Sequence, residues 1–312
     1  DEATIEYGGS QFAGSEAGIW CPYGDPADFP PDQRAEDGLS LTFDSPALDE
    51  AMEIAGFPEV VLTVAADQPN ALLAVRLCDV APSGTSLLVS RGLLNLTHRD
   101  SHEHPEALEP GQYYTVTVRL DVIAHRIPAG HRWRVAVSPT YWPMAWPSPV
   151  PATLSLRTGS GSELWLPVRP PRADDAALPA FGPAVQAAAI PVEITCDSSR
   201  NRLLTRDVGG HSLEIRDILD GGRKRLVDTD LEMHGHNDDV YRIVEDEPLS
   251  ATIRCQRTTG LRRGSWQVRI ETVSTMSSDA GHFYVTNVLD AYEGHTRVFT
   301  RTRELKIPRH LV

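Results

Sequence analysis

Residues 114–122 read Tyr-Thr-Val-Thr-Val-Arg-Leu-Asp-Val, so apolar and polar side chains alternate along the whole stretch. Alternation with a period of two is typical of a β-strand that buries one face and exposes the other to water. The same pattern returns at residues 132–137 and 153–157. We therefore expect antiparallel strands, each with one face in a core.

Two further stretches are more continuously apolar. Residues 60–64 and 72–77 are suited to strands that are buried on both faces or lie centrally in a sandwich. Segments rich in proline, glycine and asparagine separate the strands, at 67–70, 82–84, 109–111 and 128–130. Short strands at this spacing indicate an all-β sandwich or jelly roll, with residues 49–54 as the best candidate for a short helical turn.

The alternation is lost in a proline-rich stretch between residues 167 and 191, which we interpret as an extended connector. Strand patterns resume at 212–216, 266–273 and 283–289. These segments predict a second antiparallel β region. The expected organisation is an N-terminal segment 1–31, a β-sandwich 32–170, a connector 171–189 and a C-terminal antiparallel region 190–312.

Composition limits the function. The chain has 312 residues, is 41% hydrophobic and 23% charged, and carries a formal net charge of −14. These values are ordinary for a soluble globular protein of about two domains. The acidic balance excludes a nucleic-acid partner, because the longest basic run is residues 223–225. No apolar run is long enough to cross a membrane, and the acidic N-terminus shows no signal peptide, which favours a cytoplasmic location.

The four cysteines, Cys21, Cys78, Cys196 and Cys255, are far apart in sequence. Their spacing fits neither a zinc finger nor a thioredoxin-like motif. Buried free thiols are the simplest interpretation, and one disulfide is the alternative. No cofactor is expected.

A catalytic serine is also not indicated. The nearest match to a Gly-x-Ser-x-Gly nucleophile turn is residues 8–12, where Phe12 stands at the second glycine position and no strand precedes. Residues 159–162, Gly-Ser-Gly-Ser, are typical of a flexible turn. We assign no catalytic residue to this chain, and leave open whether it is an enzyme.

Two histidine clusters are the candidates for a metal site, at residues 98–104 and 234–239. Histidines two positions apart on a strand point to one side, so His102 with His104, or His234 with His236, are able to share an ion. Neither pair has a further ligand at a diagnostic spacing. Solvated loops are therefore the preferred interpretation, and a metal is the alternative.

The segment 138–149 combines prolines with Tyr141, Trp142 and Trp146. Proline lacks the N–H that a sheet requires, so this segment predicts a stiff loop that presents aromatic area. Three roles fit it: a cap over the sandwich core, an interface with another domain, or direct contact with a ligand. We group it with Trp20 as the candidate binding face.

Several stretches taken in order resemble a known family. They include Asp-Gln-Arg-Ala-Glu-Asp-Gly at 32–38 and Ile-Pro-Ala-Gly-His-Arg-Trp-Arg-Val at 127–135, with 54–60, 75–84, 92–99 and 108–111 between them. Together they resemble the C-terminal non-catalytic region of the family that contains X-Pro dipeptidyl-peptidase, cocaine esterase and α-amino-acid ester hydrolase. Residues 246–251 and 307–309 look like the extension of its longer members.

The resemblance implies a galactose-binding-like jelly roll that follows an α/β-hydrolase domain carrying the catalytic triad. It implies that the chain packs on that domain, joined to it or as a separate chain, helps to close the active-site cleft and contributes to a homodimer. Tyr141–Trp146 and Trp20 are then the expected face toward the catalytic domain. Two alternatives are a free-standing, lectin-like carbohydrate-binding jelly roll and a complete hydrolase with an unorthodox site.

Side-chain roles follow for the strand at 132–137. Gly130 is expected to take a positive φ in the turn that precedes it. Arg132 and Arg134 share one face of the strand, and a guanidinium fork there is expected to bind a carboxylate such as Asp79 or Asp121.

Overall fold

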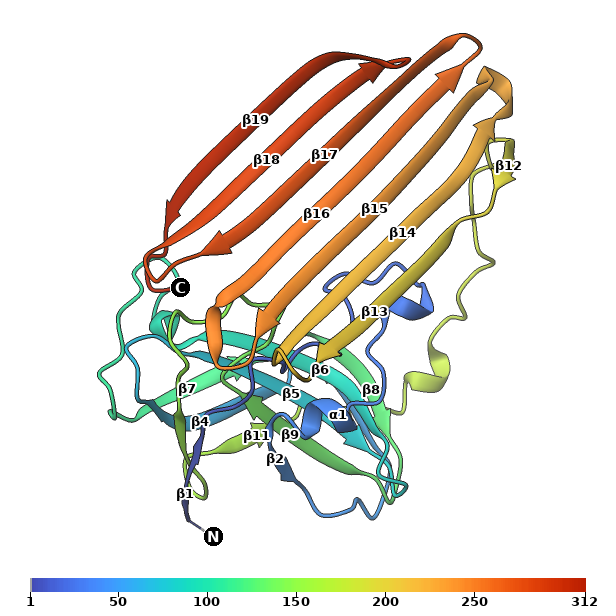
Figure 1. The fold of residues 1–312 in the computed structure, drawn as a ribbon. Coiled ribbons are helices and arrows are strands. Elements are labelled where there is room, and N and C mark those ends of the chain that lie inside the picture. The colour runs from blue at the N-terminus through green and yellow to red at the C-terminus, as the bar shows by residue number, and fades with distance from the viewer. Residues whose placement is uncertain (1) are drawn as a thin grey trace.

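The computed structural model describes residues 2–312. Figure 1 shows a β-sandwich below and a long, single-layered sheet that projects from it. The predicted fold class, an all-β sandwich with a second antiparallel β region, is confirmed. Within the described residues, no helix is long and apolar enough to span a membrane.

The sandwich consists of two main sheets and a strand pair. One sheet has the order β1-β10-β4-β11 with β7 also on β4, the other the order β2-β9-β5-β6, and β3 pairs with β8. The strands are β1 (Thr4–Tyr7), β2 (Leu41–Asp44), β3 (Met52–Gly56), β4 (Glu59–Ala66), β5 (Leu72–Val80), β6 (Ser86–Asn95), β7 (Tyr114–Arg119), β8 (Ile123–Ile127), β9 (Arg132–Ser138), β10 (Leu154–Arg157) and β11 (Glu163–Trp165). The short helices are η1 (Pro26–Asp28), α1 (Arg34–Asp37), η2 (Leu96–His98), η3 (Asp175–Ala177) and η4 (Val227–Thr229).

Strand β5 lies at the centre of the sandwich and is buried along its whole length. Leu73, Val75 and Leu77 point into the core between the sheets. The opposite face of the strand carries Leu72 and Ala74, which pack under other parts of the chain. The expectation that residues 72–77 are buried on both faces is therefore correct.

The N-terminal segment is woven into the sandwich. Strand β1 pairs antiparallel with β10. The buried carboxylate of Glu36, on α1, accepts hydrogen bonds from the Gly14 N–H at 2.7 Å, the Glu16 N–H at 2.8 Å and the Ser15 hydroxyl at 3.2 Å. Three donors satisfy a carboxylate that burial would otherwise penalise heavily. This loop of the N-terminal segment is thus held against α1.

The long sheet has the order β12-β14-β15-β16-β17-β18-β19, with β13 also on β14. Its strands are β12 (Val192–Cys196), β13 (Ser199–Asp207), β14 (Ser212–Leu226), β15 (Leu231–Val244), β16 (Glu247–Arg263), β17 (Trp266–Ser278), β18 (His282–Glu293) and β19 (Thr296–Pro308). β14 bends at Gly222, where β12 replaces β13 as its partner. Gly222 has φ +66°, and a Cβ there would lie 2.3 Å from the Cys196 carbonyl oxygen, so glycine is required.

Some local expectations need correction. Residues 49–54 do not form a helical turn, because Met52–Gly56 is strand β3 and pairs with β8. His234 and His236 lie within strand β15 and not in a loop. Cys78 is buried, but the other free thiols are exposed at Cys21 and Cys196 and partly buried at Cys255. Gly130 takes φ +83°, as expected.

Candidate functional site

The aromatic loop between β9 and β10 lies where the sandwich meets the long sheet. Tyr141 and Trp142 are 2% and 1% exposed, and the Trp142 N–H donates to the Ala13 carbonyl at 2.7 Å. Burial raises the pKa of Tyr141 to about 12, so its hydroxyl stays neutral at physiological pH. These side chains are enclosed within the chain and offer no surface to a second protein.

Trp146 carries the contact across to the long sheet. Its ring meets Trp142 edge-on at 5.5 Å between centroids and meets Phe283 of β18 at 5.7 Å, also edge-on. Its Nε1–H donates to the Ser278 hydroxyl at 3.0 Å. Edge-to-face aromatic contacts add about 0.5–1.5 kcal/mol each beyond their buried area. The loop therefore joins two β regions of one chain.

A small apolar cluster surrounds this loop, and we call it the junction. Its buried members come from the N-terminal segment, the loop and three strands of the long sheet: Phe12, Trp142, Leu213, Ile243 and Ala251. Tyr241 and Ile253 pack against it from β15 and β16. Sequence reasoning missed these partners, because alternation shows which residues of a strand share a face and not what that face contacts.

Polar contacts from the N-terminal segment reinforce the junction. Glu245, at the turn between β15 and β16, accepts from the Ser10 hydroxyl at 2.8 Å and from the Gln11 N–H at 2.9 Å. The buried carboxylate of Asp28 is ion-paired with Arg200 of β13. Arg202 donates to the Gly18 carbonyl at 3.0 Å. Residues 10–28 are therefore tied to the long sheet as well as to the sandwich.

The C-terminal residues also contact the aromatic loop and the sandwich. Arg309 is buried, and its Nη2 donates to the Pro147 carbonyl at 2.6 Å and its Nη1 to the Ser278 hydroxyl at 3.2 Å. Burial lowers the pKa of Arg309 to about 10. The Leu311 carbonyl accepts from Asn95 and Thr97 of the sandwich. The end of the chain thus fastens β19 to the loop beneath it.

Trp20, the fourth predicted binding residue, lies apart from the other three. It is 66% exposed, with the Arg91 guanidinium 5.6 Å from the centre of its ring. Tyr23 and Phe29 of the same segment are also exposed. We call Trp20, Tyr23 and Phe29 the N-terminal aromatic patch. The Asp28 carboxylate accepts from the Tyr23 N–H at 2.6 Å, which holds the patch in shape.

The arginine fork of β9 does not bind Asp79 or Asp121. Arg134 donates to both oxygens of Asp44 at 2.6 and 2.7 Å, and its Nη1 lies 2.9 Å from Asp37. Hydrogen bonds to Asp44 and Asp37 raise the pKa of Arg134. The fork bridges β2 and α1, because Asp44 is directly opposite Arg134 in the β2–β9 register.

Asp79 has histidine partners instead. Its buried carboxylate lies 2.9 Å from Nε2 of His125 and 2.7 Å from Nδ1 of His131. The three residues come from β5, β8 and the turn before β9. They tie the β3–β8 pair to the larger sheet. The carboxylate–imidazole contact has the form found in hydrolytic triads, and here it links strands of the sandwich.

In the described part of the chain, Ser10 and Ser160 of the two glycine-containing stretches bond to carboxylates and not to histidine. Ser10 donates to Glu245, and the Ser160 hydroxyl donates to Glu2 at 3.0 Å. The Nδ1 atoms of His98 and His102 are 3.4 Å apart. Among residues 2–312, no three histidine, cysteine, aspartate or glutamate side chains are grouped so that they could hold a metal ion.

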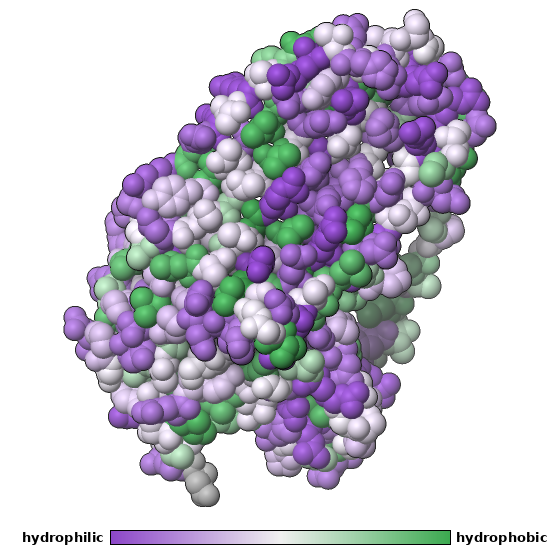
Figure 2. All heavy atoms as spheres, viewed as in Figure 1, coloured by the Kyte–Doolittle hydropathy of each residue, from purple (hydrophilic) through white to green (hydrophobic). Residues whose placement is uncertain are grey.

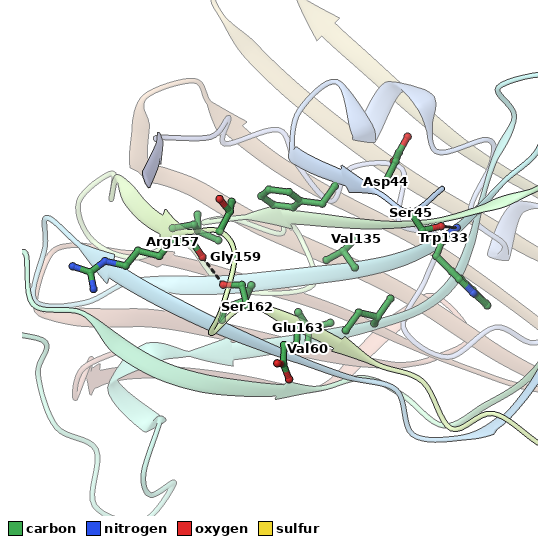
Figure 3. Close-up of a pocket in the computed structure, with 14 residues that line it drawn as sticks. Asp44, Ser45, Val60, Trp133, Val135, Arg157, Gly159, Ser162 and Glu163 are labelled. Carbon is green, nitrogen blue, oxygen red and sulfur yellow. Dashed lines mark hydrogen bonds between the residues drawn. The ribbon is translucent and has the colours of Figure 1, made fainter. Parts of the chain in front are cut away.

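A cavity of ≈ 320 Å³ opens between the two sheets of the sandwich. Figure 3 shows it between β2 and β9 on one side and β10 and β11 on the other. Val60, Leu62, Val135 and Leu156 line its walls, while Arg157 and Glu163 lie at its rim. The aliphatic lining fits an apolar group better than a sugar.

The fold and the junction define an all-β module: a sandwich fastened to a long sheet. Residues 7–166 match the family described as the X-Pro dipeptidyl-peptidase C-terminal non-catalytic domain, and this is just over half of the chain. The chain belongs to this family. The resemblance drawn from the motifs at 32–38 and 127–135 is therefore confirmed.

The chain is also similar to parts of several known proteins. A candidate serine esterase of Mycobacterium bovis is 27% identical over 125 residues, which are 35% of this chain and 20% of that protein. The cocaine esterase of a Rhodococcus species is 25% identical over 118 residues, 38% of this chain and 20% of that protein. An α-amino acid ester hydrolase structure is 28% identical, with a TM-score of 0.44, and covers 48% of this chain and 30% of its own. The chain thus spans about a fifth of the length of the curated relatives.

Proposed function

We propose that the chain is the non-catalytic β-sandwich part of a serine hydrolase. It packs on an α/β-hydrolase catalytic domain, joined to it or separate, shapes the active-site cleft and self-associates. The main support is that residues 7–166 match a non-catalytic family, while the matched part is only a fifth of relatives that are named as esterases. The rest of such a relative is large enough to contain a catalytic domain.

The N-terminal aromatic patch is the surface that best fits the catalytic domain. The aromatic loop, which the sequence favoured, is already enclosed at the junction. Trp20, Tyr23 and Phe29 expose rigid aromatic area, which interfaces between proteins favour. Asp28 and Arg91 hold the patch against the sheet and the sandwich, so little ordering is needed on binding.

The experiment combines the chain with the hydrolase domain that adjoins it in its polypeptide or is encoded beside it. Hydrolysis of an activated ester and of an Ala-Pro-anilide is measured for the unchanged protein and for Trp20→Ala with Tyr23→Ala. We expect the double variant to lose association with the hydrolase domain and to raise KM. Phe181→Ala is the matched control, since Phe181 is a fully exposed aromatic residue of the connector.

A second experiment uses the purified chain alone to test the proposal that the chain is non-catalytic. The chain is expected to leave both substrates intact and to resist labelling by a fluorophosphonate probe. Turnover that disappears after a single Ser→Ala change would show that the chain has its own nucleophile and would overturn the proposal.

The lectin-like alternative has one observation in its favour. Trp165, at the end of β11, is exposed and donates its Nε1–H to Glu163 at 3.0 Å, so an aromatic face stands beside a polar group. Such a platform is able to stack on a sugar ring. Calorimetric titration with oligosaccharides checks this, and binding that Trp165→Ala abolishes would support the alternative.

A further inference from the structure

The cavity between the two sheets of the sandwich originates in the strand register. Strand β4 pairs with β10 as far as Thr63, which lies opposite Arg157, and with β11 from Val61, which lies opposite Glu163. Leu62, between them, has no cross-strand neighbour from β10 or β11. Side chains on one face of a strand repeat every two residues, so a continuous strand would place one more inward side chain opposite Leu62. The cavity lies where that side chain is missing.

The turn between β10 and β11, residues 158–162, leaves the sheet at this point. It reads Thr-Gly-Ser-Gly-Ser, and both of its glycines take a positive φ. The Ser162 hydroxyl donates to the Arg157 carbonyl at 2.5 Å, and the Thr63 hydroxyl donates to the Gly161 carbonyl at 3.1 Å. The Thr63 side chain lies on the face of β4 opposite the core, because burial alternates along this part of the strand. The turn is therefore fastened outside the core, and the space beside β4 stays open.

The walls of the cavity are core side chains from both sheets. Val60, Leu62 and Leu156 come from the sheet of β4, and Trp133 and Val135 come from β9 in the facing sheet. All five side chains are at most 8% exposed, so the surrounding core holds them in place. Facing sheets are only about 10 Å apart, so a space between them admits a thin apolar group but no strand or helix. The cavity is therefore a preformed site of small-molecule size.

The charged residues at the cavity direct their charges elsewhere. Alternation along β10 places Arg157 on the face opposite the core, where its guanidinium lies 3.8 Å from the centre of the Tyr113 ring. Figure 3 shows the side chains of Arg157 and Glu163 pointing away from the apolar walls. Asp44 accepts two hydrogen bonds from Arg134. The interior therefore favours an uncharged ligand, since burying a charge without a partner is costly.

Two serine hydroxyls beside the apolar walls are able to meet a polar group of a ligand. The Ser45 hydroxyl donates to the Pro46 carbonyl, and the Ser162 hydroxyl donates to the Arg157 carbonyl. Each serine oxygen also accepts one backbone N–H, which leaves one lone pair for a further donor. A ligand with an apolar body and one hydroxyl group matches this combination.

We propose that this cavity binds a small, uncharged alcohol whose apolar body is one aromatic ring or a short aliphatic chain. Its volume of ≈ 320 Å³ lies at the lower end of the range for ligand pockets, about 300–1,000 Å³, and is about twice the roughly 150 Å³ of an apolar cavity that binds benzene. On the face of the molecule shown in Figure 2, hydrophobic side chains are scattered among hydrophilic ones, whereas the cavity gathers apolar side chains around one space. The inference goes beyond the proposed function, because the site lies within this chain's own sandwich.

The test is an NMR titration of the 312-residue chain with benzyl alcohol and with hexanol. Hexanoate and hexylammonium are the charged counterparts of hexanol. We expect both alcohols to bind with a Kd of about 1 mM or tighter, and both charged probes to bind at least about 10-fold more weakly.

Leu62→Phe extends one wall into the cavity. We expect this variant to bind both alcohols at least about 10-fold more weakly, while its melting temperature stays the same or rises because the ring fills empty space. Leu77→Phe is the matched control, since Leu77 is fully buried in the same core and does not line the cavity. It is expected to lower the melting temperature by overpacking and to leave binding of the alcohols unchanged.

Three results would overturn the inference. The first is that neither alcohol binds to the unchanged chain. The second is binding that survives Leu62→Phe, or that survives Leu164→Phe, a second lining variant used if Leu62→Phe does not fold. The third is a fall in melting temperature for Leu62→Phe as large as that for Leu77→Phe, because the chain's own side chains would then fill the space.

Discussion

The sandwich and the long sheet come from the same alternating sequence pattern but are stabilised in different ways. In the sandwich, β5 is buried on both faces, and two enclosed charged side chains have partners: Glu36 accepts hydrogen bonds from the N-terminal segment, and Arg76 is ion-paired with Asp37. In the long sheet, β19 is exposed along its entire length. Its neighbours are held by cross-strand pairs and by the junction. The difference teaches that alternation specifies a strand face, while a second layer decides whether that face stabilises the fold.

The largest difference in stability between the two regions is expected when a buried charged side chain is replaced. Arg76 is enclosed and pairs with Asp37 at 3.0 Å, so Arg76→Leu strips a buried carboxylate of a partner. We expect a loss of about 4 kcal/mol in the free energy of unfolding, measured by urea denaturation. The matched change in the long sheet, Arg225→Leu, breaks exposed pairs with Glu193 and Asp230 and should leave the free energy of unfolding almost unchanged, because water screens these pairs. Equal losses would contradict the comparison.

The second largest difference in stability is expected when an apolar side chain is shortened to alanine. Leu77→Ala leaves a cavity in the sandwich core, and we expect it to cost about 3 kcal/mol. Leu305→Ala removes the same atoms from β19, where the Leu305 side chain is exposed, and should cost less than about 1 kcal/mol. Denaturation of both variants at low protein concentration measures the contrast. A large loss for Leu305→Ala would mean that the long sheet has a core of its own.

A third substitution is expected to make the two regions unfold separately. Trp146→Ala removes the edge-on contacts with Trp142 and Phe283 and the hydrogen bond to Ser278, a loss of about 2 kcal/mol. We expect scanning calorimetry to resolve two transitions, with the long sheet unfolding first. Trp165→Ala, at an exposed tryptophan outside the junction, is the control and should leave the profile unchanged. A single, unshifted transition for Trp146→Ala would show that the junction does not couple the regions.

The smallest effect is a pH dependence at the β17–β18 turn. The Tyr284 hydroxyl, above all, and the Gly281 and His282 N–H groups lower the pKa of Asp279 to about 2. A carboxyl whose pKa is lowered by folding contributes stability above its unfolded pKa, and that stability is lost as pH falls through the folded value. Asp279→Asn should therefore remove a small loss of thermal stability between about pH 4 and about pH 2. An unaltered pH profile would place the acid sensitivity elsewhere.

Much of the sandwich could be predicted from sequence, because the hydrophobic pattern of each strand is uniform along its length. Residues 72–77 became a strand buried on both faces, and the alternation at 114–122 became a strand over residues 114–119. Residues 60–64 also form a strand, but its buried and partly buried side chains alternate. The long strands β15 and β16 were not predicted, since their polar content, with His234, His236 and many arginines, is typical of a loop. Neighbouring strands on both sides form hydrogen bonds with the backbone of β15 and β16. The sequence of one segment does not reveal such pairing with distant segments.

The sequence by itself determined the all-β class, the family and the positive φ of Gly130, because these depend on local periodicity, motif order and backbone sterics. Only the tertiary structure decided that Tyr141, Trp142 and Trp146 contact the chain's own long sheet, that Trp20 stands apart, and that Arg134 binds Asp44 and Asp37. Those outcomes depend on which distant segments meet. A side chain's partner is set by the packing of the whole chain, whereas its face on a strand is set by its neighbours in sequence.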